Sequence, residues 1–183
     1  TYETVQIGAQ CWFAENLQTT VYADGSEIPL EGTGSGWSLL ETGARCPLDD
    51  DASNVSALGY IYNGYAVLNA SGLCPSGWKV PSEGDWQLLL SEVGEDARLL
   101  KSPTDWDGLA EGNSGFSAIP AGARSGSIGW IPGQYYDQTK ANFWSSTTSG
   151  SSLGYYHIQP DNNVVSSNAA GQTFGWSVRC IQD

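Results

Sequence analysis

The sequence predicts an α+β fold in which two short helices flank small antiparallel sheets joined by long irregular loops. One observation is a well-specified helix, residues 82–93, with few other segments of comparable helical quality. The other is the composition of the second half, where glycine, serine, asparagine and aromatic residues separate short apolar runs, as is typical of short strands and loops. No internal repeat or linker interrupts the chain. We therefore expect a single domain over residues 1–183.

The predicted helix has clear start and stop signals. Ser82 is a good N-cap residue, and Asp85 three positions later resembles the second member of a capping box. One apolar face follows, formed by Trp86, Leu89, Leu90 and Val93. Gly94 suits the left-handed position that often ends a helix. We expect this helix to pack on the sheet with Trp86 largely buried.

The remaining elements follow from short patterns. Strands are expected at residues 5–7, 11–17, 143–147, 155–159, 164–167 and 176–181. Residues 60–69 are ambiguous between a strand and a short helix, and a weaker second helix is expected at residues 96–101.

The charge excludes two classes of partner. The chain has 7 Lys and Arg residues against 20 Asp and Glu, a formal net charge of −13. Because no window clusters basic residues, neither nucleic acid nor an anionic membrane surface is an expected partner. No stretch approaches the roughly 20 apolar residues of a membrane-spanning helix, so membrane insertion is not expected either.

Four cysteines, Cys11, Cys46, Cys74 and Cys180, are widely spaced. Their spacing excludes the CxxC redox motif and zinc-ribbon patterns. An even number fits two disulfides formed in an oxidising compartment, with four buried thiols as the alternative.

Catalytic and metal-binding patterns are weak. The run Asp49-Asp50-Asp51 offers oxygen ligands for Ca²⁺, but it lacks EF-hand spacing, and a solvated acidic loop is favoured. His157 is the single histidine, and no GxSxG motif marks a nucleophilic serine. We therefore assign no catalytic residue, no metal and no cofactor.

The segment from Tyr135 to Asn168 has the composition of a recognition surface. Tyrosine supplies rigid contact area, and serine and asparagine supply adaptable hydrogen bonds. Alternation along residues 155–159 places Tyr156 and Ile158 on the inward face, although an aromatic residue on either face could contribute to the core. The candidate ligand-binding residues are Tyr135, Tyr136, Asp137, Tyr155, His157, Gln159, Asp161, Asn162, Asn163, Ser166, Ser167 and Asn168. The alternative is an ordinary polar loop and sheet edge.

Four motifs carry a family resemblance. In chain order they are VQIGAQCWFAENL at residues 5–17, LCPSGWKVPSEGDW at 73–86, FWSSTT at 143–148 and GWSVRCIQD at 175–183. Together they resemble the Fibrobacter succinogenes major paralogous domain, which is similar in fold to C-type lectins and formylglycine-generating enzymes.

The resemblance implies a C-type lectin-like fold, with a helix in the second half of residues 60–69. It places the first main helix beside the last strand, so a Cys74–Cys180 disulfide is expected first and a Cys11–Cys46 disulfide second. In some proteins with this fold, retroelements diversify the C-terminal segment at asparagine-related codons, and Asn162, Asn163 and Asn168 are residues of that kind.

The sequence thus leads to a non-enzymatic binding module for a protein or glycan ligand on a cell or host surface. It would be extracellular, displayed on a cell surface or carried on a virion. One alternative is a catalytic relative of the formylglycine-generating enzymes, which depend on reactive cysteines; no cysteine pair here is placed to serve as one. The other is a structural adhesion or surface domain.

Overall fold

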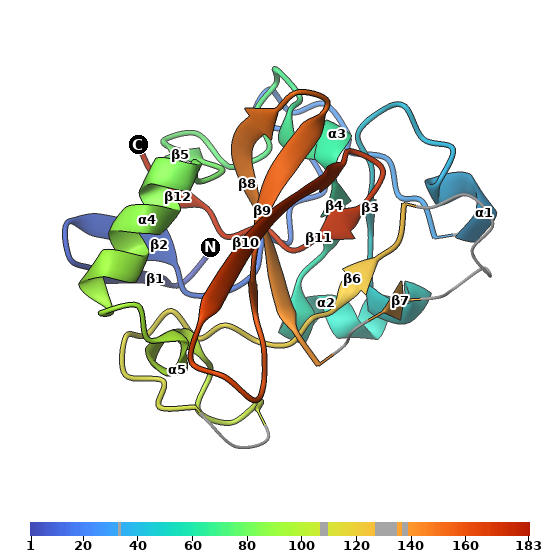
Figure 1. Cartoon of the computed structure of the whole chain (residues 1–183). Helices are drawn as coiled ribbons and strands as arrows, with labels where there is room; N and C mark the ends of the chain where they lie inside the picture. Colours follow the sequence, from blue (N-terminus) through green and yellow to red (C-terminus); the bar gives the residue numbers. More distant parts are fainter. Residues whose placement is uncertain (33, 107–109, 127–134, 137–138) are drawn as a thin grey trace.

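A computed structural model describes residues 1–32, 34–106, 110–126, 135–136 and 139–183. Short helices surround three small sheets whose named strand pairs are antiparallel, so the α+β class is confirmed (Figure 1). The expectation of two helices is wrong, because the described residues form five. The helices are α1 (Gly34–Trp37), α2 (Val55–Leu58), α3 (Gly64–Val67), α4 (Glu83–Glu92) and α5 (Ala97–Leu100), with 3₁₀ turns at Leu48–Asp50 and Ala52–Asn54.

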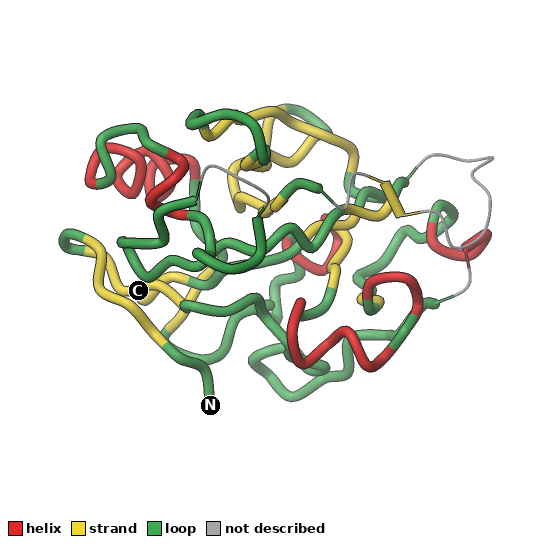
Figure 2. The backbone as a smooth tube through the Cα atoms, turned by 90° about the horizontal axis from the view of Figure 1, so that it is seen from below, coloured by secondary structure: helices red, strands yellow, loops and turns green. Residues whose placement is uncertain are grey.

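The first sheet joins the two ends of the chain. Its strand order is β1-β2-β12-β5. The strands are β1 (Thr4–Ile7), β2 (Gln10–Phe13), β5 (Trp78–Lys79) and β12 (Ile181–Gln182). Both termini therefore lie on the same side of the molecule, beside this sheet (Figures 1 and 2).

The second sheet is a three-stranded meander with the order β10-β9-β8. Its strands are β8 (Ala141–Ser149), β9 (Ser152–Ile158) and β10 (Val165–Gly171). All three predicted strands of this region are confirmed and are longer than expected, although Gln159 and Val164 lie just outside them. A bulge in β8 between Trp144 and Thr148 shifts its register against β9.

The third sheet has the order β3-β4-β11-β6-β7. Its strands are β3 (Arg45–Cys46), β4 (Ile61–Asn63), β6 (Ala123–Arg124), β7 (Tyr135–Tyr136) and β11 (Gly175–Trp176). The ambiguous segment, residues 60–69, proves to contain both β4 and the short helix α3.

The predicted strand at residues 176–181 is wrong as a continuous element. The chain leaves the third sheet after Trp176 and enters the first at Ile181. Between them the backbone carbonyls bond to three other segments: Ser177 accepts from Trp144, Val178 from Leu17 and Cys180 from Phe13. Because its hydrogen-bond partners lie in three different segments, the buried stretch between Trp176 and Ile181 does not join a single strand pair.

Helix α4 confirms the strongest local prediction. The Ser82 hydroxyl accepts from the Asp85 amide at 3.2 Å, and the Asp85 carboxylate accepts from the Ser82 amide at 2.8 Å. Burial would raise the pKa of Asp85, but hydrogen bonds from Ser82 and the charge of Lys79 outweigh it and lower that pKa. Gly94 has φ +62°, as a left-handed helix end requires. Trp86 is fully buried, as predicted.

Two core clusters cover opposite faces of the second sheet. On one face, Phe143 and Tyr156 pack with Trp86 of α4. On the other, Trp144 and Leu153 pack with residues of β4, β11 and the Cys74–Cys180 region. The adjacent β8 residues Phe143 and Trp144 therefore pack in different core clusters, and β9 lies between these two clusters.

The Cys74–Cys180 disulfide is present and links segments 106 residues apart, as predicted. The second predicted disulfide is wrong, because Cys11 and Cys46 remain thiols. Cys11 lies on β2 of the first sheet, whereas Cys46 lies on β3 and packs in a third cluster with Trp37 and Ile61. Different sheets therefore hold the two side chains.

Candidate functional site

The β9–β10 hairpin carries most of the predicted ligand-binding residues. Its antiparallel register sets His157 opposite Ser166 and Tyr155 opposite Asn168. Because side chains alternate, these four share one face of the hairpin, whereas Ser167, opposite Tyr156, lies on the other. Strand β10 is an edge strand of its sheet, and its side chains are exposed or half-buried.

A chain of polar contacts closes the end of the hairpin. Nε2 of His157 lies 3.4 Å from Nε2 of Gln159. The Asn162 side-chain amide donates to the Gln159 side-chain oxygen at 3.0 Å and accepts from the Val164 amide at 3.1 Å. The structure thus brings together His157, Gln159 and Asn162, and it gives Asn162 a structural role within the turn.

Buried Lys101 stabilises the turn between β9 and β10 through two hydrogen bonds. Its ammonium group donates to the carbonyl oxygens of Pro160 at 3.0 Å and Asn162 at 3.1 Å, and it lies 4.9 Å from the centre of the Trp106 ring. The Ala97 amide at the start of α5 also donates to the Asn163 carbonyl. Burial lowers the pKa of Lys101, against the opposing effect of Asp161. Sequence reasoning missed this residue, because a lysine next to a short helix usually extends into solvent.

Tyr155 differs from the expectation of a freely exposed contact residue. Its ring stacks on Trp176 with centroids 4.1 Å apart, and Trp176 in turn stacks on Phe174 at 5.5 Å. The His157 ring lies 5.8 Å from that of Tyr155. Burial raises the pKa of Tyr155. Tyr155 is therefore half-buried and packs against the core, because both faces of β9 contact a core cluster.

The other predicted residues separate by exposure and by sheet. Asp161, Asn163, Ser167 and Asn168 are exposed, whereas Ser166 is half-buried. Tyr135 and Tyr136 form β7 and pair with β6, so they belong to the third sheet and not to the hairpin sheet. Asp137 lies outside the described residues.

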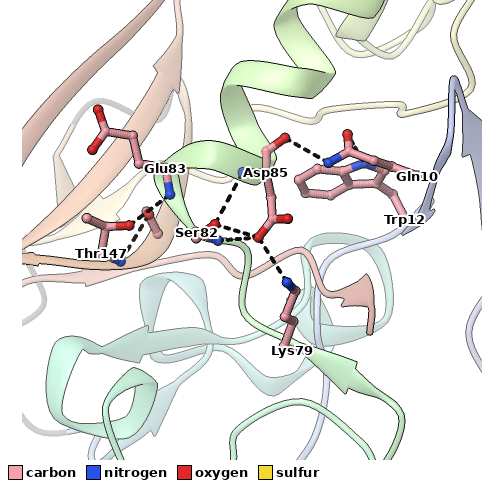
Figure 3. Close-up of polar contacts among 8 residues, drawn as sticks. Gln10, Trp12, Lys79, Ser82, Glu83, Asp85 and Thr147 are labelled. Atoms are coloured by element: carbon pink, nitrogen blue, oxygen red, sulfur yellow. Dashed lines mark hydrogen bonds and ion pairs between the residues drawn. The ribbon is translucent and has the colours of Figure 1, made fainter.

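A cleft of about 140 Å³ lies on the α4 side of the hairpin. It is lined by Glu83, Ser145, Thr147, Ser149, Gly154, Tyr155, Tyr156, Ser167, Asn168 and Ala169. The Glu83 amide donates to the Thr147 hydroxyl at 2.8 Å, which joins the start of α4 to β8 (Figure 3). Burial, followed by the Glu83 carboxylate, raises the pKa of Tyr156. The cleft thus combines hydroxyl groups, an aromatic ring and a carboxylate.

Within the described ranges, no group of three or more His, Cys, Asp or Glu side chains is arranged to hold a metal ion. Asp50 of the acidic run instead pairs with Arg124 at 2.7 Å. None of the helices described has the length and apolar character needed to cross a membrane.

Comparison with known proteins supports the motif-based resemblance. Residues 5–182 match the Fibrobacter succinogenes major domain. Neither the curated proteins nor the solved structures give a match. Because the family match covers nearly the whole chain, the chain belongs to the Fibrobacter succinogenes major domain family.

Proposed function

We propose that this chain is a non-enzymatic binding module that presents the β9–β10 hairpin to a protein or glycan ligand on a cell or host surface. The observation that best supports this proposal is a set of exposed polar side chains on a hairpin whose turn is held by buried Lys101. The exposed residues are Asp161, Asn163, Ser167 and Asn168. A backbone that is already fixed loses little further conformational freedom on binding, which leaves only the ordering of the side chains.

A C-type lectin-like fold is part of the proposal. It is supported by the family membership, by the position of α4 next to the first sheet and by the Cys74–Cys180 link between the α4 region and the C-terminal segment. The same disulfide supports display outside the cell or on a virion, since disulfides persist in oxidising compartments.

Diversification by a retroelement would fit this arrangement. Asn163 and Asn168 are exposed, and their side chains lie away from both core clusters. Such positions can vary without loss of the core. The genomic test is a neighbouring reverse transcriptase gene with a near-copy of the segment that encodes β9 and β10.

Binding to cells and glycans tests the proposed function. Labelled protein is titrated onto a panel of bacterial and host cells and onto immobilised glycans. We expect saturable binding to at least one surface. Combined replacement of Asp161, Asn163, Ser166, Ser167 and Asn168 by Ala should weaken it by at least about tenfold, since a few contacts usually carry most of the affinity.

A matched control changes exposed residues in or beside a different sheet from the one that carries the hairpin. Glu3, Ser76, Gln182 and Asp183 lie in or beside the first sheet and are exposed. Their combined replacement by Ala should leave binding unchanged. Equal binding by the wild-type protein and the hairpin variant would contradict the proposal.

A further inference from the structure

The chemistry of the residues that line the cleft on the α4 side of the hairpin favours a positively charged ligand group. Hydroxyl groups come from three strands, through Thr147 and Ser149 on β8, Tyr156 on β9 and Ser167 on β10. Glu83 also lines the cleft; its carboxylate accepts from the Gln87 side-chain amide at 3.2 Å and helps to raise the pKa of Tyr156. The described lining contains neither lysine nor arginine. Hydroxyl and carboxylate oxygens together accept hydrogen bonds from a cation.

The start of α4 does not offer the cleft an anion site. The Glu83 amide already donates to Thr147, and the Asp85 amide donates to the Ser82 hydroxyl. The carboxylates of Glu83 and Asp85 also offset the positive end of the helix dipole. An anion entering the cleft would therefore meet the negative charge of Glu83 and few available amides.

Gly154 keeps the floor of the cleft open. A Cβ atom at this position would lie 3.3 Å from the Thr147 carbonyl oxygen and 3.6 Å from the Ser145 Cβ atom. Its φ lies outside the positive range that favours glycine, so backbone conformation does not require a glycine here. A glycine within a strand is destabilising and often marks a close approach by another group.

Another part of the cleft floor is an aromatic surface that packs against the core. Tyr156 is buried, and its ring stacks on Trp86 at 4.8 Å. Ala169 completes this part of the lining. A methylene chain can lie on such a floor while a charged end group meets Glu83 and the hydroxyl groups at the rim.

We propose that the cleft receives the side chain of a lysine from a protein partner bound at the hairpin. This inference rests on the proposed function and narrows its ligand to a protein with an exposed lysine. The net charge of −13 supports it, because a strongly acidic surface attracts basic partners and speeds their association.

An NMR titration with a minimal probe tests the inference. Nα-acetyl-lysine methylamide is titrated into the full chain, with the norleucine analogue as an uncharged control of similar shape. We expect saturable shifts of the Thr147, Gly154 and Ser167 amide signals with the lysine probe. The norleucine probe should bind more weakly by about twofold to fivefold, the range of a partly exposed ion pair.

Two variants locate the site. Glu83→Gln should weaken the lysine probe by a similar factor, and Gly154→Ala should weaken both probes by filling the floor. Glu92→Gln removes the same charge from an exposed residue in the last turn of α4 and should have no effect on either probe. Equal binding of the two probes, unsaturable shifts, or full affinity in Glu83→Gln would overturn the inference.

The inference and the proposed function can fail separately. If the five-alanine hairpin variant loses the cell-surface ligand while Glu83→Gln retains full affinity for it, the lysine assignment is wrong and the hairpin remains the binding surface. If the five-alanine variant retains the ligand, the proposed function is wrong whatever the lysine probe shows.

Discussion

Trp86 connects the best-defined helix to the sheet that carries the hairpin. Its indole is fully buried and contacts the rings of Trp12, Phe143 and Tyr156, with centroids 4.8–5.7 Å away. Trp86→Ala should lower the free energy of unfolding by about 3–5 kcal/mol, as large-to-small core changes do. Denaturant unfolding measures this loss; a change below about 1 kcal/mol would show that α4 is not part of the core.

Asp85 gives a pH-dependent prediction at the same helix. Its folded-state pKa is below the ordinary value, so its contribution is present above about pH 4 and is lost as the pH falls through the folded pKa. Asp85→Asn keeps the size but removes the charge near the helix start and Lys79. It should cost about 1 kcal/mol at pH 7 and progressively less below pH 4. Unfolding curves from pH 2 to 7 check this, and a pH-independent difference would contradict it.

The turn between β9 and β10 depends on Lys101. Lys101→Met keeps the apolar stem but leaves the Pro160 and Asn162 carbonyls without their ammonium donor. We expect a loss of about 1–3 kcal/mol and faster hydrogen exchange of the turn amides. Exchange measured by mass spectrometry should change over residues 159–165, with α4 unaffected.

Lys79→Met is the matched control for this change, because Lys79 is exposed. It should leave exchange in the turn as it is in the wild-type protein. Unchanged exchange in Lys101→Met would mean that the turn holds its conformation without the lysine.

Local patterns predicted the elements that local interactions define. The Ser82 cap, the Trp86 face and Gly94 lie within thirteen residues, and α4 forms as expected. Alternation correctly placed Tyr156 and Ile158 inward. The division of residues 176–181 between two sheets was not predictable in this way, because its hydrogen-bond partners Phe13, Leu17 and Trp144 are distant in sequence.

The candidate site was predictable in composition but not in shape. Exposed Asp161, Asn163, Ser167 and Asn168 follow from a polar segment after a strand with a clear inward face. The cleft does not, because it joins Glu83 to strand residues more than sixty positions later. Glu83 alone reads as an ordinary first-turn residue of a helix.

At the scale of the whole molecule, the Cys74–Cys180 disulfide constrains the scaffold. It closes a loop over a separation of 106 residues, for which the chain-entropy model gives about 4–5 kcal/mol. Combined Cys74→Ala and Cys180→Ala replacement should destabilise the protein by that amount. Alkylation after denaturation without reductant should label two cysteines, Cys11 and Cys46; labelling of all four would refute the disulfide.

The central claim is that the exposed side chains of the hairpin are separable from the fold that carries them. Two core clusters hold β8 and β9, while Asp161, Asn163, Ser167 and Asn168 are exposed on the turn and the edge strand, and Ser166 beside them is half-buried. Exposed substitutions usually change stability by no more than about 0.5 kcal/mol each.

The most direct test is the free energy of unfolding of the five-alanine hairpin variant, measured by denaturant beside the wild-type protein. The predicted result is a cooperative transition with a stability loss of no more than about 2.5 kcal/mol, since each of the five changes should cost about 0.5 kcal/mol at most. A loss of more than about 4 kcal/mol, or a loss of cooperativity, would show that these side chains belong to the core and would contradict the account.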